Sequence, residues 1–170
     1  MHSNQWNKER IRAMFDRQAD RVYRTAMVLM KNQHDAEDIV QSVFLTVLEK
    51  DIQFDSPEHE KAWFIVTTRN RCKDVLKSYW RKSVDLKDED INAGELTSAE
   101  IEHVHDHDKE LAEHILEGLS DVQREIVLLH YYEGYTVKEV AEMLELKESS
   151  VRSAISSAKR AINKLTVRKN

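Results

Sequence analysis

The sequence predicts an all-α protein. Its 170 residues include only 3 glycines and 1 proline, too few for the many turns of a β-sandwich or barrel. Nearly every apolar run has the i, i+3, i+4 spacing of an amphipathic helix. Two short sequences, SDVQ from residue 120 and TVKE from residue 136, have the spacing of capping boxes, which start helices. A hydrophobic content of 41% is enough to pack such helices into cores.

The charge is unevenly distributed and divides the chain into three parts. Residues 1–82 carry a net charge of +3, residues 83–116 of −9 and residues 117–170 of +1. The acidic middle part has few large apolar residues, which is typical of a mobile linker. We therefore predict a helical domain over residues 1–82, an acidic linker over 83–110 and a second helical domain over 111–170.

Composition also limits the compartment and the chemistry. The single cysteine, Cys72, excludes an intrachain disulfide and fits a reducing compartment, and we expect it to be a core residue, because no second thiol could resolve its oxidation. The first residues lack the apolar core of a signal peptide, and no run of about 18 apolar residues could span a bilayer. We expect a cytoplasmic protein without membrane insertion, and we predict no cofactor.

Three helices are predicted in the first domain. A long opening helix is followed by a helix over residues 35–50, and a third begins with Ser56 as its cap and Pro57 in the first helical position, and runs to about residue 82. Each helix has a predicted apolar face. In the first helix it comprises Ile11, Phe15, Val22, Ala26, Leu29 and Met30; in the second, Ala36, Ile39, Val40, Val43, Phe44, Val47 and Leu48; and in the third, Trp63, Phe64, Val66, Cys72, Val75, Leu76 and Tyr79.

The second domain is predicted to end in a helix-turn-helix over residues 136–164. A helix that resumes after residue 97 leads to one that opens at Ser120, with Val122, Ile126, Val127, Leu129 and Tyr132 as its apolar face. A short helix then starts at Thr136, turns at residues 145–147 and is followed by a longer helix. From residue 149 to the end there are six Lys or Arg and no acid, and basic and small polar side chains oppose the apolar stripe. This arrangement suits insertion into a DNA major groove, although an amphipathic helix with a solvated basic face has the same pattern.

The end of the third helix is a second basic surface. Residues 69–82 contain six Lys or Arg and one acid, with aromatic residues close by. Basic residues interleaved with aromatic ones suit strands whose bases are unstacked. A basic last turn would also be explained by the helix dipole alone.

These motifs, in this order, resemble the bacterial sigma-70 family of RNA polymerase sigma factors. Residues 35–44 (DAEDIVQSVF), with Phe54, Trp63, Arg69 and Asn70, resemble the family's second region. Residues 119–129 (LSDVQREIVLL), 134–144 (GYTVKEVAEML) and 150–153 (SVRS) resemble its fourth region. Two regions joined by a short linker are similar to the extracytoplasmic-function, or group IV, class.

The resemblance implies partners and a role for particular residues. Asp38 and Gln41 would dock on the β′ clamp of core RNA polymerase, and the β flap would be a further contact. The loop over residues 51–60 would receive a flipped base of the minus-ten element, and the acidic linker would thread toward the polymerase active centre. An anti-sigma factor is a further implied partner. The implied minus-ten contacts are Phe54, Asn70, Arg69, Arg71, Lys73, Lys77 and Arg81, and the implied minus-thirty-five contacts are Arg152, Ser153, Ser156, Ser157, Lys159 and Arg160.

Some positions depart from the family pattern. Glu145 stands where Gly is usual at the helix corner, and Lys147 replaces the usual Ser or Thr cap, so Ser149 is the expected substitute cap. Ala154 and Ser157 replace residues that are commonly Arg, and Thr67 and Thr68 replace an apolar or small pair. From these departures we predict weak minus-thirty-five binding.

Two other functions fit parts of the sequence. A stand-alone helix-turn-helix regulator would bind duplex DNA without polymerase. A metal-dependent hydrolase could use the run over residues 103–108 (HVHDHD), but alternating histidines on a helix point in different directions, so adventitious metal binding is the expected outcome. We predict a sigma factor with no catalytic activity, which directs promoter recognition and transcription initiation.

Overall fold

The computed structural model describes residues 2–85 and 117–168. Every regular element in these two ranges is helical, which confirms the predicted fold class. The chain divides into two compact units, Met1–Thr97 and Ser98–Asn170. The division falls between the two described ranges, and the domain boundaries drawn from the sequence, at 82 and 110, stay predictions.

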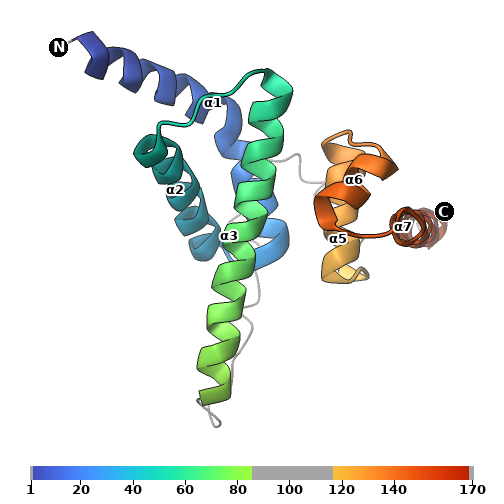
Figure 1. The fold of residues 1–170 in the computed structure, drawn as a ribbon. Helices are drawn as coiled ribbons and strands as arrows, with labels where there is room; N and C mark the ends of the chain where they lie inside the picture. The colour runs from blue at the N-terminus through green and yellow to red at the C-terminus, as the bar shows by residue number, and fades with distance from the viewer. Residues whose placement is uncertain (1, 86–116, 169–170) are drawn as a thin grey trace. The chain divides into compact units, whose positions relative to one another are not determined.

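The first unit is built from three helices, α1 (His2–Met30), α2 (Gln33–Lys50) and α3 (Pro57–Asp85), each packed against the other two (Figure 1). The start of α3 follows the sequence prediction: the Ser56 hydroxyl accepts a hydrogen bond from the His59 amide at 3.0 Å, and Pro57 is the first helical residue. The C-terminal half of α3 extends beyond the other two helices. Part of α3 is therefore presented outside the bundle.

One core fills this three-helix unit. Its fully buried side chains include Val22, Val43, Val47, Phe64 and Cys72, so the prediction of Cys72 as a core residue is confirmed. The rings of Phe15 and Phe44 lie 4.9 Å apart and those of Phe44 and Phe64 5.1 Å apart, which joins one helix to the next. Such close-packed aromatic pairs add to the stability that burial alone gives.

Several predicted core positions are wrong. Leu48, Val66 and Tyr79 are exposed, and Phe15 is half exposed although its ring meets Phe44. These residues lie at the edges of their apolar stripes or where a helix outruns its neighbours. Periodicity indicates which face a side chain shares but not whether another helix covers it.

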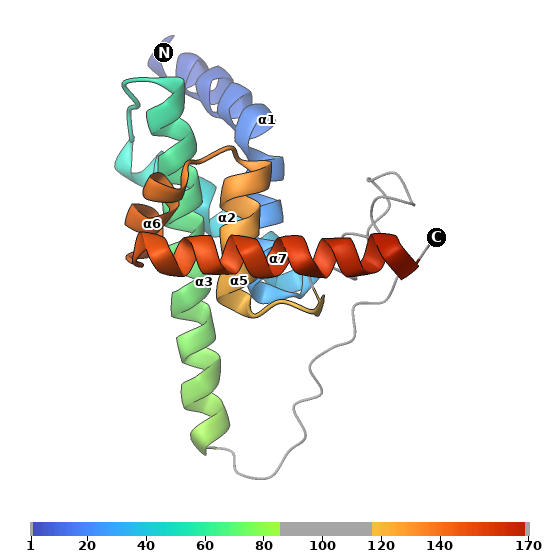
Figure 2. The ribbon, with the colours of Figure 1, turned by 90° about the vertical axis from the view of Figure 1, so that its right-hand side faces the viewer.

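The second unit contains α5 (Asp121–Val127), η1 (Leu128–Tyr132), α6 (Val137–Leu144) and α7 (Glu148–Arg168). Both predicted capping boxes are present, one at Ser120 with Gln123 and one at Thr136 with Glu139. The helix α7 packs on α5 and α6 and runs across α5 (Figure 2). The helix-turn-helix predicted from the sequence is formed by α6 and α7.

The helix α5 continues into a π-helical turn, η1, which the sequence did not predict. In η1 the Glu133 amide donates to the Leu128 carbonyl at 3.0 Å, five residues back. Leu128 and Leu129 are buried, whereas Val122 and Tyr132, both predicted on the apolar face, are exposed. The π-helical turn breaks the α-helical spacing on which the prediction for Tyr132 rested.

The predicted linker and the helix expected after residue 97 lie largely outside the described residues. Of the linker range 83–110, only residues 83–85 are described, and they continue α3. None of the described helices is both long and apolar enough to cross a membrane.

Candidate nucleic-acid interface

One side of α3 carries a row of exposed residues that face away from the core. Asn70, Lys73, Lys77 and Trp80 follow one another at intervals of three and four residues, and Arg81 is adjacent, so all five share a side of the helix. All five are exposed, and no ion pair among the described residues engages the three cations. We call these five residues the α3 stripe. It has the charge and shape to hold a phosphate backbone.

Two of the predicted cations lie off this row or are partly buried. Arg71 points toward α2, where its Nη2 donates a hydrogen bond to the Thr46 hydroxyl at 2.9 Å. Arg69 is half-buried. The structure thus gives Arg71 a role in holding α2 against α3, which no local sequence pattern could reveal, because its partner lies 25 residues away.

At the start of α3, Phe54 lies within an aromatic cluster. Its ring centroid is 5.5 Å from those of His59 and Trp63 and 5.9 Å from that of Phe64. Beside it the surface is hollowed by an open pocket of about 370 Å³. The pocket is lined by Arg17, Gln18, Phe54, Asp55, Ser56, Pro57 and Glu60. The loop predicted to receive a flipped base therefore does border a hollow.

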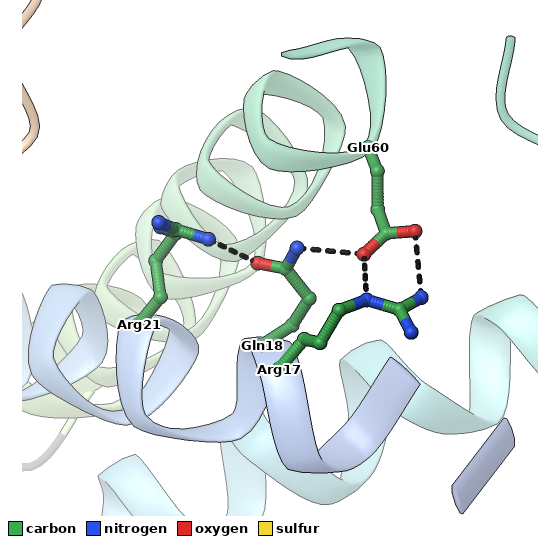
Figure 3. A network of polar contacts seen from close by, with 4 residues as sticks. All are labelled: Arg17, Gln18, Arg21 and Glu60. Atoms are coloured by element: carbon green, nitrogen blue, oxygen red, sulfur yellow. Dashed lines mark hydrogen bonds and ion pairs between the residues drawn. The ribbon is translucent and has the colours of Figure 1, made fainter. Parts of the chain in front are cut away.

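A polar network forms one wall of this pocket (Figure 3). Glu60 is only 8% exposed and accepts hydrogen bonds from Arg17 Nε and Nη2, at 3.2 and 3.1 Å, and from Gln18 Nε2 at 2.7 Å. Arg21 in turn donates to Gln18 Oε1. Sequence reasoning missed Arg17 and Gln18, because they come from α1, some 40 residues before the loop.

Two opposing effects set the pKa of Glu60. Burial alone would raise it, but the hydrogen bonds from Arg17 and Gln18 and the positive charges of Arg17 and Arg21 outweigh burial, so the pKa is lowered. The same contact raises the pKa of Arg17. Glu60 is thus held as a carboxylate, and it fixes the first turn of α3 to α1.

The predicted polymerase contacts lie on the outer side of α2. Asp38 and Gln41 are both exposed and lie off the buried face formed by Ala36, Ile39 and Val43. His34 Nε2 lies 3.7 Å from Asp38 Oδ2, and both side chains are well exposed. These side chains are accessible for a partner.

A hydrogen bond links the start of α2 to the far half of α3. The Tyr79 hydroxyl donates to Asp35 Oδ1 at 2.8 Å. This bond, with smaller effects of burial and of the negative charges of Asp35 and Asp38, raises the pKa of Tyr79. Tyr79 was predicted to be a core residue, but its ring is exposed and its hydroxyl contacts α2 through Asp35.

In the second unit, α7 exposes most of the side chains that were predicted to contact DNA. Arg152, Ser153, Ser156, Lys159 and Arg160 are exposed and Ser157 is half-buried, whereas Val151, Ile155 and Ala158 are buried beneath them. Ser153 and Ser157 border an open hollow of about 350 Å³. It is lined by Val122, Gln123, Ile126, Leu146, Ser150, Ser153, Ala154 and Ser157.

The helix corner corrects two expectations. Because α7 begins at Glu148, Ser149 lies inside the first turn and is not the cap; the Lys147 carbonyl accepts from the amides of Ser150 and Val151 at 3.0 and 3.2 Å. Ala154 is buried and is not part of the exposed basic face, so the alanine does not reduce the positive charge of that face. Glu145 does adopt the left-handed conformation, with φ of 55°, where glycine is usual.

An acid also lies close to the basic face. Glu148 Oε2 accepts a hydrogen bond from Arg152 Nη2 at 2.9 Å, between two partly exposed side chains. Arg152, one of the predicted DNA contacts, therefore has an anionic partner within its own helix.

The described residues hold no group of three or more His, Cys, Asp or Glu side chains that could bind a metal ion. The histidine run over residues 103–108 lies outside the described residues.

Both described units match models of one protein family. Residues 14–82 match the family model of sigma-70 region 2, and residues 109–162 match that of sigma-70 region 4. The chain belongs to the sigma-70 family. Its curated relatives include ECF RNA polymerase sigma factors, which confirms the resemblance drawn from the sequence.

Three of these relatives span different shares of the chain. SigX of Bacillus subtilis is 22% identical and covers 86% of this sigma factor, which covers 78% of SigX. SigL of Mycobacterium tuberculosis is 27% identical, with 89% and 86% covered. SigE of Mycolicibacterium smegmatis is 32% identical over 81% of this chain, which spans only 54% of that longer protein.

Solved structures share the fold. RpoE of Bartonella quintana, solved with the anti-sigma factor NepR, has a TM-score of 0.67 at 19% identity, with 94% of this sigma factor and 95% of that chain covered. CnrH, solved with the cytosolic domain of CnrY, has a TM-score of 0.59 at 18% identity, with 96% and 91% covered. At these identities the likeness concerns the fold alone.

Proposed function

We propose that this sigma factor joins core RNA polymerase, directs it to promoters with two sequence elements, and stabilises the melted non-template strand. The observation that carries this proposal is the order of the two matched regions, region 2 before region 4, each with an exposed basic surface. A stand-alone regulator needs only the helix-turn-helix and leaves the first unit without a role.

In the first unit, Asp38 and Gln41 would dock on the coiled coil of the β′ clamp. The position of these two residues supports this assignment, because both lie off the apolar face of α2 and both are accessible. The β flap would be the second contact with polymerase.

The minus-ten element would be held by Phe54 and Asn70, with phosphates steered by Arg69, Arg71, Lys73, Lys77 and Arg81. The pocket beside Phe54 supports capture of a flipped base, because it is open, partly aromatic and bordered by polar groups. Among the cations, Lys73, Lys77 and Arg81 have the best position for phosphate, while Arg71 must first give up Thr46.

In the second unit, Arg152, Ser153, Ser156 and Ser157 would read the minus-thirty-five element, and Lys159 and Arg160 would contact its backbone. Their exposure on α7 supports this assignment. We expect weak binding, because three of the four readers are serines and the fourth pairs with Glu148.

The proposed role requires no catalytic group in this chain, since binding energy alone stabilises the open promoter. It also places the protein in the cytoplasm, with polymerase and DNA. An anti-sigma factor that covers polymerase-binding surfaces is a further proposed partner, supported by the NepR complex of a protein with the same fold.

The decisive experiment is transcription in vitro with core RNA polymerase and total genomic DNA of the source bacterium, followed by sequencing of transcript ends. We expect new, discrete start sites preceded by two shared motifs. If core polymerase gains no start-site selectivity, the proposal is wrong.

A further inference from the structure

Trp80 has no assigned role in the proposed function, yet its exposure demands a reason. Its side chain is 73% exposed, more than any other large apolar side chain whose exposure the structure describes. It belongs to the C-terminal half of α3. Leaving an indole in water is unfavourable, and a large exposed aromatic ring commonly marks a binding site.

The direction of this side chain is fixed by its neighbour. Tyr79, one residue earlier, points toward α2 and donates its hydroxyl proton to Asp35 at 2.8 Å. Successive residues of a helix differ by about 100° in direction, so Trp80 lies on a different side of α3 from Tyr79. Trp80 therefore falls in the α3 stripe, in line with Lys73 and Lys77.

The surroundings of the indole indicate what covers it. Lys77 and Arg81 flank it, Lys82 follows, and none of the three is engaged by an ion pair within the described residues. A ring set among cations is complementary to a polyanion that also offers flat apolar faces. A nucleic-acid strand has both, whereas an intact duplex hides its base faces.

Distance along the helix relates this ring to the minus-ten surface. Trp80 is ten residues after Asn70, which corresponds to about 15 Å along a helix axis. That span is a few nucleotides of an extended strand. A strand held at Asn70 can therefore follow Lys73 and Lys77 to the indole.

We propose that Trp80 stacks against an unstacked base face of the melted promoter, and that Tyr79, through Asp35, is the positioning residue that holds the ring toward the DNA. The inference rests on the proposed function and adds a contact to it. The base face could belong to the separated non-template strand or to the last base pair at the edge of the melted segment. Both offer the same stacking chemistry.

The test uses holoenzyme assembled from core polymerase and the full chain, on a promoter identified from wild-type transcripts. Trp80→Ala should lower open-complex formation by about five-fold to a hundred-fold, the range for one base–aromatic stack. Trp80→Phe should retain most of the activity because it keeps a ring. Trp80→Leu should behave like the alanine variant, because it keeps apolar bulk but has no aromatic face.

Two templates distinguish the sources of the base. If the defect of Trp80→Ala persists on a template with a mismatched, premelted minus-ten segment, the ring holds the separated strand. If the defect is confined to the fully paired template, the ring acts at the edge of the melted segment. Either result supports stacking, and equal activity of the alanine variant and wild type on both templates overturns it.

Controls separate this inference from its alternatives. Ser78→Ala, an exposed neighbour outside the stripe, should leave open-complex formation unchanged. If Trp80→Ala instead weakens the affinity for core polymerase, the ring covers a protein surface and the inference is wrong. A failure of the wild-type protein to select any start site would refute the proposed function itself, which is a different outcome.

The positioning role has its own readout. Tyr79→Phe and Asp35→Ala should each lower open-complex formation by a similar factor, and the double variant should lose no more than either one. Asp35→Asn, which keeps an acceptor oxygen, should restore most of the activity. Additive losses, or losses matched by a fall in polymerase affinity, would contradict the assignment of Tyr79.

Discussion

Arg17 and Glu60 face each other across the boundary between α1 and α3, with both guanidinium donors within 3.2 Å of the two carboxylate oxygens. Gln18 adds a third hydrogen bond to the same carboxylate. This contact fixes the first turn of α3, and with it the loop that carries Phe54. The geometry of the proposed base pocket thus depends on a carboxylate that itself faces away from bulk solvent.

We expect Glu60→Gln to destabilise the first unit by about 1–2 kcal/mol, because hydrogen bonds to a charged acceptor are replaced by weaker neutral ones. Tryptophan fluorescence during urea unfolding reports this unit specifically, since all three tryptophans lie at residues 6, 63 and 80. Glu58→Gln is the matched control: it removes the same charge from the same helical turn at an exposed position. Equal losses for both variants would show that only the helix dipole is affected.

The same carboxylate predicts a dependence on pH. The pKa of Glu60 is lowered below its ordinary value of 4.5, so its contribution to stability is complete above that value and is lost as pH falls through the lowered pKa. The difference in unfolding free energy between wild type and Glu60→Gln should therefore be constant from pH 7 to about 5 and shrink in acid. A difference that stays constant down to pH 3 would argue against a lowered pKa.

The sequence predicted local features well and distant ones poorly. Both capping boxes, at Ser120 and Thr136, depend on residues three positions apart, and both were predicted. The contacts of Glu60 with Arg17 and of Arg71 with Thr46 join residues 43 and 25 positions apart, which no periodicity encodes.

The sequence also failed to predict which side chains are buried. Helical spacing placed Leu48 and Val66 on apolar faces, but it could not show that no helix covers them. Ala154 is the reverse case. The Arg that is common at this position in the family suggested an exposed position, whereas packing within the second unit buries Ala154. Both errors have one cause, because coverage is set by the arrangement of helices and not by the pattern within one.

We expect Glu145→Gly to stabilise the second unit by about 1 kcal/mol. A non-glycine residue in the left-handed region costs about 1–2 kcal/mol, and glycine removes this cost but loses more conformational entropy on folding. The φ of 55° at this corner is the basis of the prediction. Hydrogen exchange of the amides of α6 and α7 measures the change. Glu142→Gly, inside α6, should have the opposite sign. A loss of stability in the Glu145 variant would mean that its side chain makes a contact worth more than the strain.

Docking on polymerase is tested by two substitutions that change charge equally. Asp38→Asn should weaken the affinity for core polymerase by about ten-fold, as expected for loss of an interface contact of roughly 1.4 kcal/mol. Glu37→Gln removes one charge from the adjacent position, and its Oε1 is engaged by Gln33 at 3.0 Å, so it should have little effect. Affinities from fluorescence anisotropy at two salt concentrations provide the comparison. Equal effects that vanish at high salt would indicate long-range attraction and no specific contact at Asp38.

The last prediction concerns Glu148, whose carboxylate holds Arg152 at 2.9 Å on the recognition helix. An exposed ion pair of this kind contributes about 0.2–1 kcal/mol, and Arg152 must give it up to bind a DNA base or phosphate. Glu148→Gln should therefore strengthen holoenzyme binding to promoter duplex by up to about five-fold. Arg152→Ala should weaken binding, and in that background Glu148→Gln should gain less. Footprinting of the minus-thirty-five segment across a salt series measures both effects, and an unchanged footprint for Glu148→Gln would mean that Arg152 does not contact the DNA.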